Sequence, residues 1–294
     1  LEYIGCKLDK DVERRTMKIT QPVLLQSLKD EFELPDREYM IPAPAGEELH
    51  PDSPGDKLLD PSGQTKYQSG VGKLMHMAKW SQPDILNSVR ELSKLMTIPR
   101  QSHLKAMLRC MKYVVLTPDV GLVLKPKRKW DGKDKNFEFE ISGMADAEYA
   151  KDTESRRSIS GYCTFLEGAV VSAKSKQQRC LTLSTTEAEM MAMTECVQDM
   201  LYIRDVIQSL ELKVKFPMII YCDNKGAVDL VNNWSTSGRT RHMATKTMFL
   251  RELKEEGILK VDWVPNTEMV SDVFTKNLGD KDFLNCIKKF VGVN

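Results

Sequence analysis

The order of strand-like and helix-like runs after residue 137 is the feature that most restricts the fold of this chain. Apolar and polar residues alternate from Phe137 to Ile141 and predict a strand, and the runs SISGYCTFLE and AVVSAKS, separated by Gly168, predict two more in hairpins. A helix from about Ser184 to Leu210 follows, then strand PMIIYCD, a helix from Asn224 to Val231, a helix ending at Gly257 and strand ILKVDWV. Three antiparallel strands followed by two parallel strands in α/β connection predict a mixed five-stranded sheet of the α/β class, with flanking helices.

The first half of the chain is mainly helical in its pattern. Short strand-like runs at residues 3–8 and 17–19 precede a helix over residues 22–32, and a proline-rich loop spans residues 35–61. Three further runs have apolar residues at three- and four-residue spacing, which predicts helices: KYQSGVGKLMHMAKW, QPDILNSVRELSKLM and SHLKAMLRCMKYVVL. Ser102 is the expected N-cap of the third helix.

A lysine-rich segment separates these unlike halves. The stretch LKPKRKWDGKDKN, from Leu124 to Asn136, is nearly devoid of apolar residues and predicts a linker or an exposed hairpin. A chain of 294 residues, 41% of them hydrophobic, is long enough for two domains of ordinary size. We therefore expect one domain at residues 1–125 and a second at residues 126–294.

Charge and cysteine content exclude several classes of protein. The net charge is only +1, so any basic surface for a nucleic acid must be local. Seven cysteines without a CxxC pair argue against a disulfide framework or a zinc site, and favour reduced thiols in an intracellular compartment. No signal peptide is evident and no run approaches the ~20 apolar residues of a membrane span, so no membrane association is expected. The sequence lacks an initiating Met, and we expect it to be a fragment of a longer protein.

Four acidic residues mark a candidate catalytic site: Asp146, Glu189, Asp223 and Asp272. Asp223 ends a strand that is apolar throughout, so its carboxylate should project from the carboxyl edge of the sheet, where α/β proteins place their sites. Glu189 heads the apolar stripe of the long helix, and burying a carboxylate there requires a compensating cation. Such a cluster suits two Mg²⁺ ions, with Mn²⁺ as an alternative, and in-line cleavage of a phosphodiester.

Asp146 and Asp272 also have competing interpretations. Glu148 and Asp152 lie close enough to Asp146 in sequence to take the first position. We prefer Asp146 because it directly follows the predicted strand, whereas Asp152 belongs to the following loop. Asp272 alone would be an ordinary surface aspartate, and only the other three carboxylates support it.

Glu189 and Asp223 could instead serve helix N-termini. The sequence STTE that begins at Ser184 is a capping box, which leaves Glu189 inside the helix. If Thr186 were the cap, Glu189 would be the glutamate of the box. Asp223 could be a simple N-cap, a role that Asn224 could equally supply.

Six motifs follow one another between residues 137 and 280: MADAEYAKD, RRSISGY, STTEAEM, IYCDN, TRHMATKTMFLRE and SDVFTK. Together they resemble the ribonuclease H region of copia-type LTR retrotransposon Pol polyproteins. The resemblance implies a ribonuclease H-like fold and an endoribonuclease that cleaves the RNA strand of RNA–DNA hybrids by two-metal-ion hydrolysis. It places the family's catalytic and metal-binding positions on Asp146, Glu189, Asp223 and Asp272. The chain departs from the family pattern at Ala244 and Met248, where the family has Asp and His.

The first half is similar to the end of the reverse transcriptase of the same elements. The matching stretches are YIGCKL, KYQSGVGKLMHMAKWSQPDI and SHLKAMLRCMKYVVLTPDVGLVL. The resemblance implies a thumb- and connection-like remnant, with the fingers and most of the palm upstream. The sequence has no Asp-Asp dipeptide, so no polymerase activity is expected.

The resemblance also implies partners and a location. The partners would be an RNA–DNA hybrid and other Pol parts, such as the upstream fingers and palm. The location would be a cytoplasmic virus-like particle or the nucleus. The truncated polymerase and the altered helix favour an alternative, a non-catalytic or domesticated remnant that acts as a nucleic-acid- or protein-binding module.

Contacts with nucleic acid are expected around the predicted hairpins. Basic side chains there would bind phosphates without sequence preference, and hydroxyls would donate to the backbone or to 2′-OH groups. The candidate residues are Arg156, Arg157, Ser158, Ser160, Lys174, Lys176 and Arg179. A solvated strand face is an equally good interpretation of the same residues. His103 and His242 are expected to be structural or close to phosphates rather than catalytic.

Overall fold

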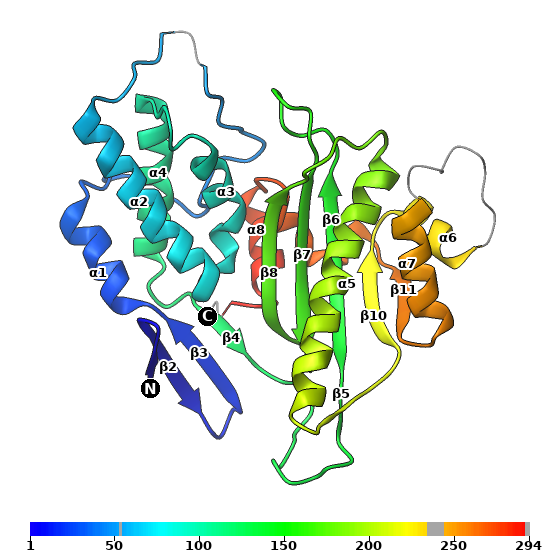
Figure 1. Cartoon of the computed structure of the whole chain (residues 1–294). Helices are drawn as coiled ribbons and strands as arrows, with labels where there is room; N and C mark the ends of the chain where they lie inside the picture. Colours follow the sequence, from blue (N-terminus) through cyan, green and yellow to red (C-terminus); the bar gives the residue numbers. More distant parts are fainter. Residues whose placement is uncertain (53–54, 234–243, 292–294) are drawn as a thin grey trace. The chain divides into compact units, whose positions relative to one another are not determined.

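The computed structural model describes the whole chain except residues 53–54, 234–243 and 292–294 (Figure 1). It contains two compact units, one formed by Leu1–Val123 with Lys276–Asn294 and the other by Leu124–Thr275. This division differs from the predicted domains in the last segment of the chain. The segment belongs to the first unit because Phe283 packs edge-on against Tyr113, with ring centroids 5.9 Å apart, and Asn277 accepts a hydrogen bond from Asn87.

The first unit combines a small sheet with several helices, and the predicted helical character of this half is confirmed. Its sheet has the order β1 (Glu2–Tyr3), β2 (Cys6–Asp11), β3 (Thr16–Thr20) and β4 (Leu122–Leu124). Its helices are α1 (Pro22–Glu31), α2 (Pro61–Trp80), the 3₁₀ helix η1 (Pro83–Ile85), α3 (Leu86–Lys94), α4 (Gln101–Leu116) and α8 (Asp280–Ile287). Among the described residues, no helix combines the length and the hydropathy that crossing a lipid bilayer would need.

The expected N-cap of α4 is wrong. The helix begins after Arg100, and Ser102 lies inside it because its hydroxyl donates to Asp56 at 2.5 Å instead. His103 is buried, accepts a hydrogen bond from the backbone N–H of Arg100 at 3.1 Å and contacts the carbonyl oxygen of His50 at 2.9 Å. His103 is therefore a structural residue of this helix start.

The second unit is built on a five-stranded mixed sheet of order β11-β10-β6-β7-β8. The large strands are β6 (Ile141–Glu148), β7 (Ile159–Leu166), β8 (Ala169–Gln177), β10 (Met218–Cys222) and β11 (Leu259–Trp263), and a small parallel pair joins β5 (Glu138–Phe139) to β9 (Lys213–Val214). Strands β6, β7 and β8 pair antiparallel, whereas β10 runs parallel to both β6 and β11. The predicted ribonuclease H-like fold class, three antiparallel strands followed by two parallel ones, is confirmed.

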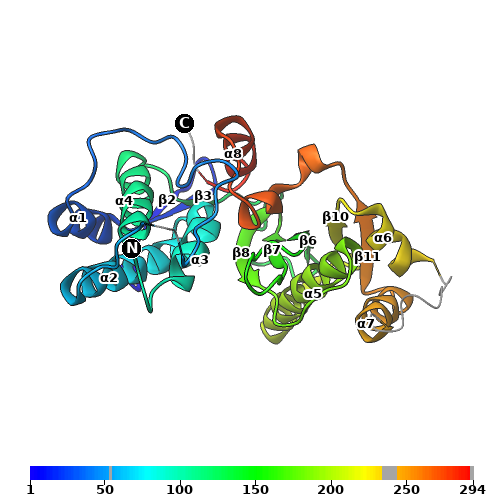
Figure 2. The same cartoon turned by 90° about the horizontal axis from the view of Figure 1, so that it is seen from above.

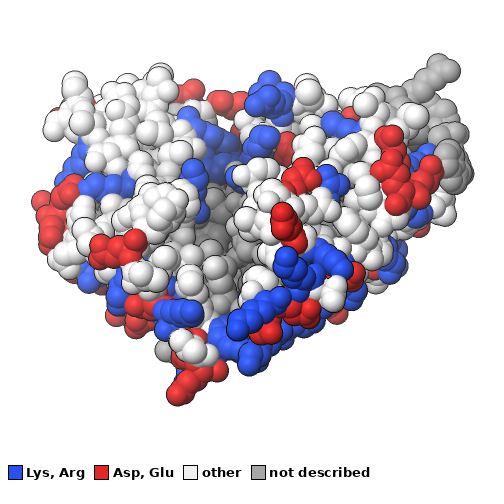
Figure 3. All heavy atoms as spheres, turned by 60° about the horizontal axis from the view of Figure 1, so that its bottom comes forward, with Lys and Arg blue, Asp and Glu red and all other residues white. Residues whose placement is uncertain are grey.

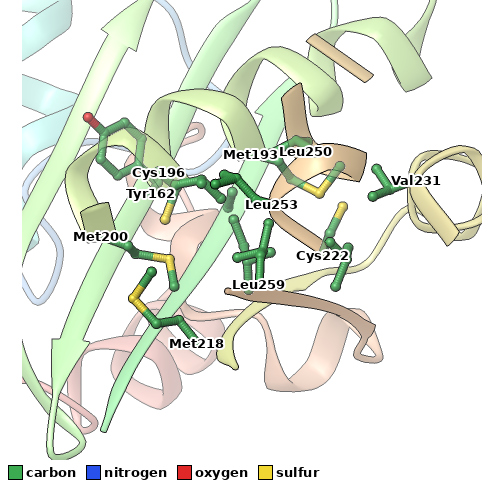
Figure 4. Packing of buried hydrophobic residues seen from close by; sticks show 14 of the residues in the cluster. Tyr162, Met193, Cys196, Met200, Met218, Cys222, Val231, Leu250, Leu253 and Leu259 are labelled. Carbon is green, nitrogen blue, oxygen red and sulfur yellow. The ribbon is translucent and has the colours of Figure 1, made fainter. Parts of the chain in front are cut away.

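Helices cover this sheet. They are α5 (Thr185–Ser209), α6 (Lys225–Asn232), α7 (Ala244–Glu255) and the 3₁₀ helices η3 (Asn266–Glu268) and η4 (Val270–Phe274). Figure 2 shows α5 and α7 on one side of the sheet and the segment of η3 and η4 on the other. Met193, Cys196 and Met200 of α5 pack on the sheet side with Met218 and Leu259 (Figure 4). The predicted apolar stripe of the long helix is thus the core of this unit.

Glycines let both layers approach the sheet closely. A Cβ atom on Gly143 of β6 would lie 2.6 Å from the sulfur of Cys196 in α5. On the other face, a Cβ atom on Gly161 of β7 would lie 2.6 Å from the methyl group of Thr275, just after η4. At Gly161 the Cβ atom would also lie 2.9 Å from Phe274 Cβ and 3.0 Å from the Ser271 carbonyl oxygen, so a larger residue there would push η4 away from β7. At Gly143 the side chains of Cys196 and Met200 would have to shift.

The lysine-rich segment 124–136 makes side-chain contacts with the second unit. Arg128 donates to the buried Glu167 at 2.9 Å, and Trp130 packs edge-on against Phe139 with ring centroids 5.2 Å apart. The segment 124–136 therefore packs on the second unit, in addition to linking the two.

Candidate active site

The four predicted carboxylates come together at the carboxyl ends of β6 and β10. Carboxylate oxygens of Asp146, Asp223 and Asp272 all lie within 4.8 Å of one another. Ligand atoms of Glu189, Cys222 and Asp223 form a second group within the same limit. Asp223 belongs to both groups, so the four acids form one continuous cluster drawn from β6, α5, η4 and the residue that follows β10.

Asp146 reaches the cluster from inside a strand. The expectation that it follows the strand is wrong, because β6 continues to Glu148 and Asp146 pairs with Gly161 of β7. Side chains alternate along a strand, so Asp146 lies on the face of η4 while Ala145 lies in the core on the α5 face. The hydroxyl of Thr275 donates a hydrogen bond to its carboxylate.

The two competitors of Asp146 are engaged elsewhere. Glu148 accepts from the ammonium of Lys151 at 2.7 Å. Asp152 caps its own turn by accepting from the backbone N–H of Ser155 at 2.8 Å. These contacts leave Asp146 as the acid of β6 in the cluster.

Glu189 is placed by the start of α5. Ser184 is the N-cap and accepts from the backbone N–H of Glu187 at 3.1 Å, as predicted, although the Glu187 carboxylate accepts from Leu183. Glu189 is 5% exposed. Burial, followed by the charges of Asp146 and Asp223, raises its pKa to about 9, even though Ala147 and Cys222 donate hydrogen bonds that lower it.

Asp223 and Asp272 complete the cluster. Asn224 caps α6 by accepting from the backbone N–H of Ala227 at 2.9 Å, so the alternative role of Asp223 as the N-cap is not used. Asp272 lies in η4 and is only 6% exposed, so it is not the surface aspartate of the alternative interpretation.

This donor set fits a divalent cation. Oxygen ligands on opposite sides of a Mg²⁺ ion with bonds of 2.0–2.1 Å are about 4.2 Å apart, so oxygens within 4.8 Å need little movement to share one ion. Burial first, and then the charges of Asp146 and Asp223, raise the pKa of Glu189, and a bound cation would oppose both effects. Cys222 is a poor ligand for such a hard ion, because Mg²⁺ prefers oxygen donors; burial also raises the pKa of its thiol.

The predicted nucleic-acid contacts divide into exposed and buried groups. Arg156, Arg157 and Arg179 are exposed near the ends of β7 and β8. Ser158 and Ser160 are fully buried, which leaves their hydroxyls unavailable to a nucleic acid. The hydroxyl of Ser158 shares a hydrogen bond with Thr182 at 2.7 Å, and that of Ser160 accepts from Gln178 at 2.9 Å.

Lys174 and Lys176 are also exposed, but they lie on the side of the sheet on which α5 packs. They pair with Tyr162 and Ser160 in the register of β7, and the side chain of Tyr162 belongs to the core under α5. Lys176 also forms an ion pair with Glu195 of α5 at 2.9 Å. The strand therefore points both lysines to the face opposite to Asp146. Figure 3 shows basic and acidic side chains interspersed, in keeping with the small net charge.

Two residues in contact with the carboxylates have no strong signal in the sequence. Thr275 stands three residues after Asp272, directly after the end of η4, and its hydroxyl contacts Asp146. Cys222 immediately precedes Asp223, and its thiol lies 3.8 Å from the Glu189 carboxylate. His242 lies outside the described residues, and Met248 of α7 is exposed.

Comparison with known proteins identifies relatives of most of the chain. It is 33% identical to the Retrovirus-related Pol polyprotein from transposon RE1 of Arabidopsis thaliana over 81% of this chain and 15% of that protein. It is 28% identical to the corresponding polyprotein from transposon TNT 1-94 of Nicotiana tabacum over 100% of this chain and 21% of that protein. The chain thus spans about a fifth or less of the length of these relatives.

The comparisons with family models and with solved structures add little information about the chain. No family model matches the chain. The N-terminal RNase H domain of a Mycobacterium tuberculosis protein is 11% identical over 51% of this chain and 98% of that domain's chain, with a TM-score of 0.34. Over most of its length, the chain is thus homologous to retrovirus-related Pol polyproteins of copia-type transposons.

Proposed function

We propose that this chain is an endoribonuclease that cleaves the RNA strand of RNA–DNA hybrids as part of a retrotransposon Pol protein. The observation that carries the proposal is the convergence of four carboxylates from separate elements at one edge of the mixed sheet. Three of the four are less than 7% exposed, and burial of several acids together is unfavourable unless cations compensate them.

Some side chains of the site would hold cations, and others would orient the substrate. Two Mg²⁺ ions, when bound, supply an activated water and stabilise the leaving 3′ oxygen. Asp146, Asp223 and Asp272 would hold one ion, and Glu189 with Asp223 would hold the second. The Glu189 carboxyl must lose its proton to do so, because its pKa is raised to about 9 without cations.

Arg156, Arg157 and Arg179 are the candidates for phosphate contacts. All three are exposed, and phosphate contacts from such side chains fix register without reading sequence. The chain would cleave hybrids alongside the other parts of the Pol protein, and we propose the upstream reverse transcriptase as its partner. No polymerase activity is proposed for the chain.

The experiment is a cleavage assay on the purified chain with a labelled RNA–DNA hybrid, Mg²⁺ and duplex DNA as the competing substrate. We expect cleavage of the RNA strand only, loss of cleavage in Asp146→Asn and Asp223→Asn, and retained folding by circular dichroism. Asp205→Asn is the matched control, because Asp205 of α5 is exposed and pairs with Arg204.

The outcomes separate the proposal from its alternative. Equal cleavage of duplex DNA would reject a ribonuclease H activity. A folded chain that binds hybrid in a salt-dependent manner but cuts nothing with Mg²⁺ or Mn²⁺ would instead support a non-catalytic binding module.

A further inference from the structure

We propose that Thr275 is a positioning residue for the carboxylate cluster and that Gly161 provides the close packing on which it depends. Thr275 would hold Asp146 in the orientation in which it shares a cation with Asp272. The inference rests on the proposed function, and it adds two residues outside the acidic set.

Thr275 contacts the carboxylate of Asp146 and the backbone of Asp272. Its side chain is fully buried, its hydroxyl donates to Oδ2 of Asp146, and its backbone N–H donates to the carbonyl oxygen of Asp272 at 3.2 Å. The hydroxyl oxygen also lies 3.1 Å from that carbonyl. A hydroxyl has one hydrogen, and its contact with Asp146 is shorter than that with the carbonyl, so we assign the hydrogen bond to Asp146.

This hydrogen bond fixes the carboxylate at a defined rotation. One oxygen of Asp146 accepts from Thr275, and the lone pairs that remain are available to a cation. Buried partners of metal-binding carboxylates act in this way, and their loss typically lowers metal affinity or activity by about 10–100-fold. Thr275 would therefore influence metal binding without touching the metal.

Gly161 makes the contact sterically feasible. It lies directly opposite Asp146 in the register of β6 and β7, on the same face of the sheet. A Cβ atom there would lie 2.6 Å from Thr275 Cγ2, 2.9 Å from Phe274 Cβ and 3.0 Å from the carbonyl oxygen of Ser271. The last two are backbone or near-backbone atoms, so η4 as a whole would have to move away from β7.

That movement would act on the site because η4 carries Asp272. A displacement of a few tenths of an ångström at Thr275 lengthens its hydrogen bond to Asp146 and carries Asp272 in the same direction. The missing side chain at Gly161 therefore lets η4 pack closely on β7, which fixes the distance between Asp272 of η4 and Asp146 of β6.

The test compares Thr275→Val, Thr275→Ser and a control, Thr164→Val. Valine keeps the shape of threonine without the hydroxyl, and serine keeps the hydroxyl without the methyl group. Thr164 of β7 is the matched control, because it is also fully buried and its hydroxyl donates to a carboxylate, Asp199, at 3.2 Å, on the face away from the cluster. Binding of Mn²⁺ alone is measured by isothermal titration calorimetry, and hybrid cleavage is measured at several Mg²⁺ concentrations.

We expect Thr275→Val to weaken Mn²⁺ binding by about 10–100-fold and to shift half-maximal cleavage to higher Mg²⁺. Thr275→Ser should recover most of the affinity, and Thr164→Val should bind Mn²⁺ like the wild type. Gly161→Ala should also weaken Mn²⁺ binding. A purely structural role would instead lower the melting temperature in EDTA and leave the metal affinity of the folded protein unchanged.

Two results would overturn the proposals separately. Wild-type affinity for Mn²⁺ in folded Thr275→Val would reject the positioning role, whatever its cleavage rate. A wild-type chain that binds no Mn²⁺ and cuts no hybrid would reject the proposed function itself.

Discussion

Replacing Glu189 by Gln should stabilise the metal-free protein at neutral pH while abolishing its proposed activity. Glu189 is 5% exposed, and burial with the charges of Asp146 and Asp223 raises its pKa from 4.5 to about 9. At pH values between 4.5 and about 9, the carboxyl group of Glu189 keeps its proton in the folded state and loses it in the unfolded state. The free energy of unfolding must therefore fall as the pH rises through this window.

The size of this change in the free energy of unfolding follows from the same two pKa values of Glu189. Each pKa unit corresponds to about 1.4 kcal/mol, so the contribution of Glu189 at pH 7 is about 3 kcal/mol less favourable than at pH 4.5. Glutamine does not ionise and escapes this loss. Its amide group would face the thiol of Cys222, however, and an imperfect hydrogen bond there costs about 1 kcal/mol. The net gain is about 2 kcal/mol at pH 7, or roughly 4–8 °C in melting temperature for a unit of this size.

Urea and thermal unfolding in EDTA between pH 5 and 8 measure this effect. The advantage of Glu189→Gln over the wild type should be small at pH 5 and should increase toward pH 8. Glu252→Gln is the control, because Glu252 of α7 is exposed and its substitution should leave the pH dependence unchanged. A wild-type stability that stays level from pH 5 to 8, together with no gain in Glu189→Gln, would refute the reasoning.

Three further substitutions test the packing that surrounds the site. Gly143→Ala should destabilise residues 124–275 by about 1–3 kcal/mol, because the new Cβ would lie 2.6 Å from the Cys196 sulfur; an unchanged urea midpoint would contradict this. Asn224→Ala should cost about 1 kcal/mol through loss of the N-cap bond to Ala227, measured by thermal denaturation. Phe283→Ala should destabilise the first unit by about 3–5 kcal/mol, and faster hydrogen exchange of the α4 amides would report it.

The features predicted well from the sequence are those with a local physical cause. The long helix was predicted from Ser184 to Leu210 and spans Thr185–Ser209, because the N-cap and the apolar stripe are both properties of neighbouring residues. The strand before Asp223 was predicted for the same reason, since five consecutive apolar or small residues leave few alternatives.

Features decided by distant residues were predicted poorly. The end of β6 depends on its pairing with β7 as far as Glu148, so the sequence alone placed Asp146 after the strand rather than inside it. The burial of Ser158 depends on Thr182, which follows β8, and a hydroxyl in a polar stretch gives no sign of that contact. Likewise, the face of Lys176 is set by strand register, which the basic pattern of the hairpin does not encode.

Asp272 is the acid of the cluster that the sequence alone supports least, because its position depends on tertiary structure. It lies in a 3₁₀ helix of five residues, which is too short for an apolar period to reveal which face is buried. Its position follows instead from the contact of η4 with β7, which Gly161 permits and a Cβ atom would prevent. Asp146 lies opposite that glycine, so one small residue sets the distance between two acids that are far apart in the sequence. A substitution outside the acidic cluster can therefore weaken metal binding at the site, and Gly161 is the position at which this should occur.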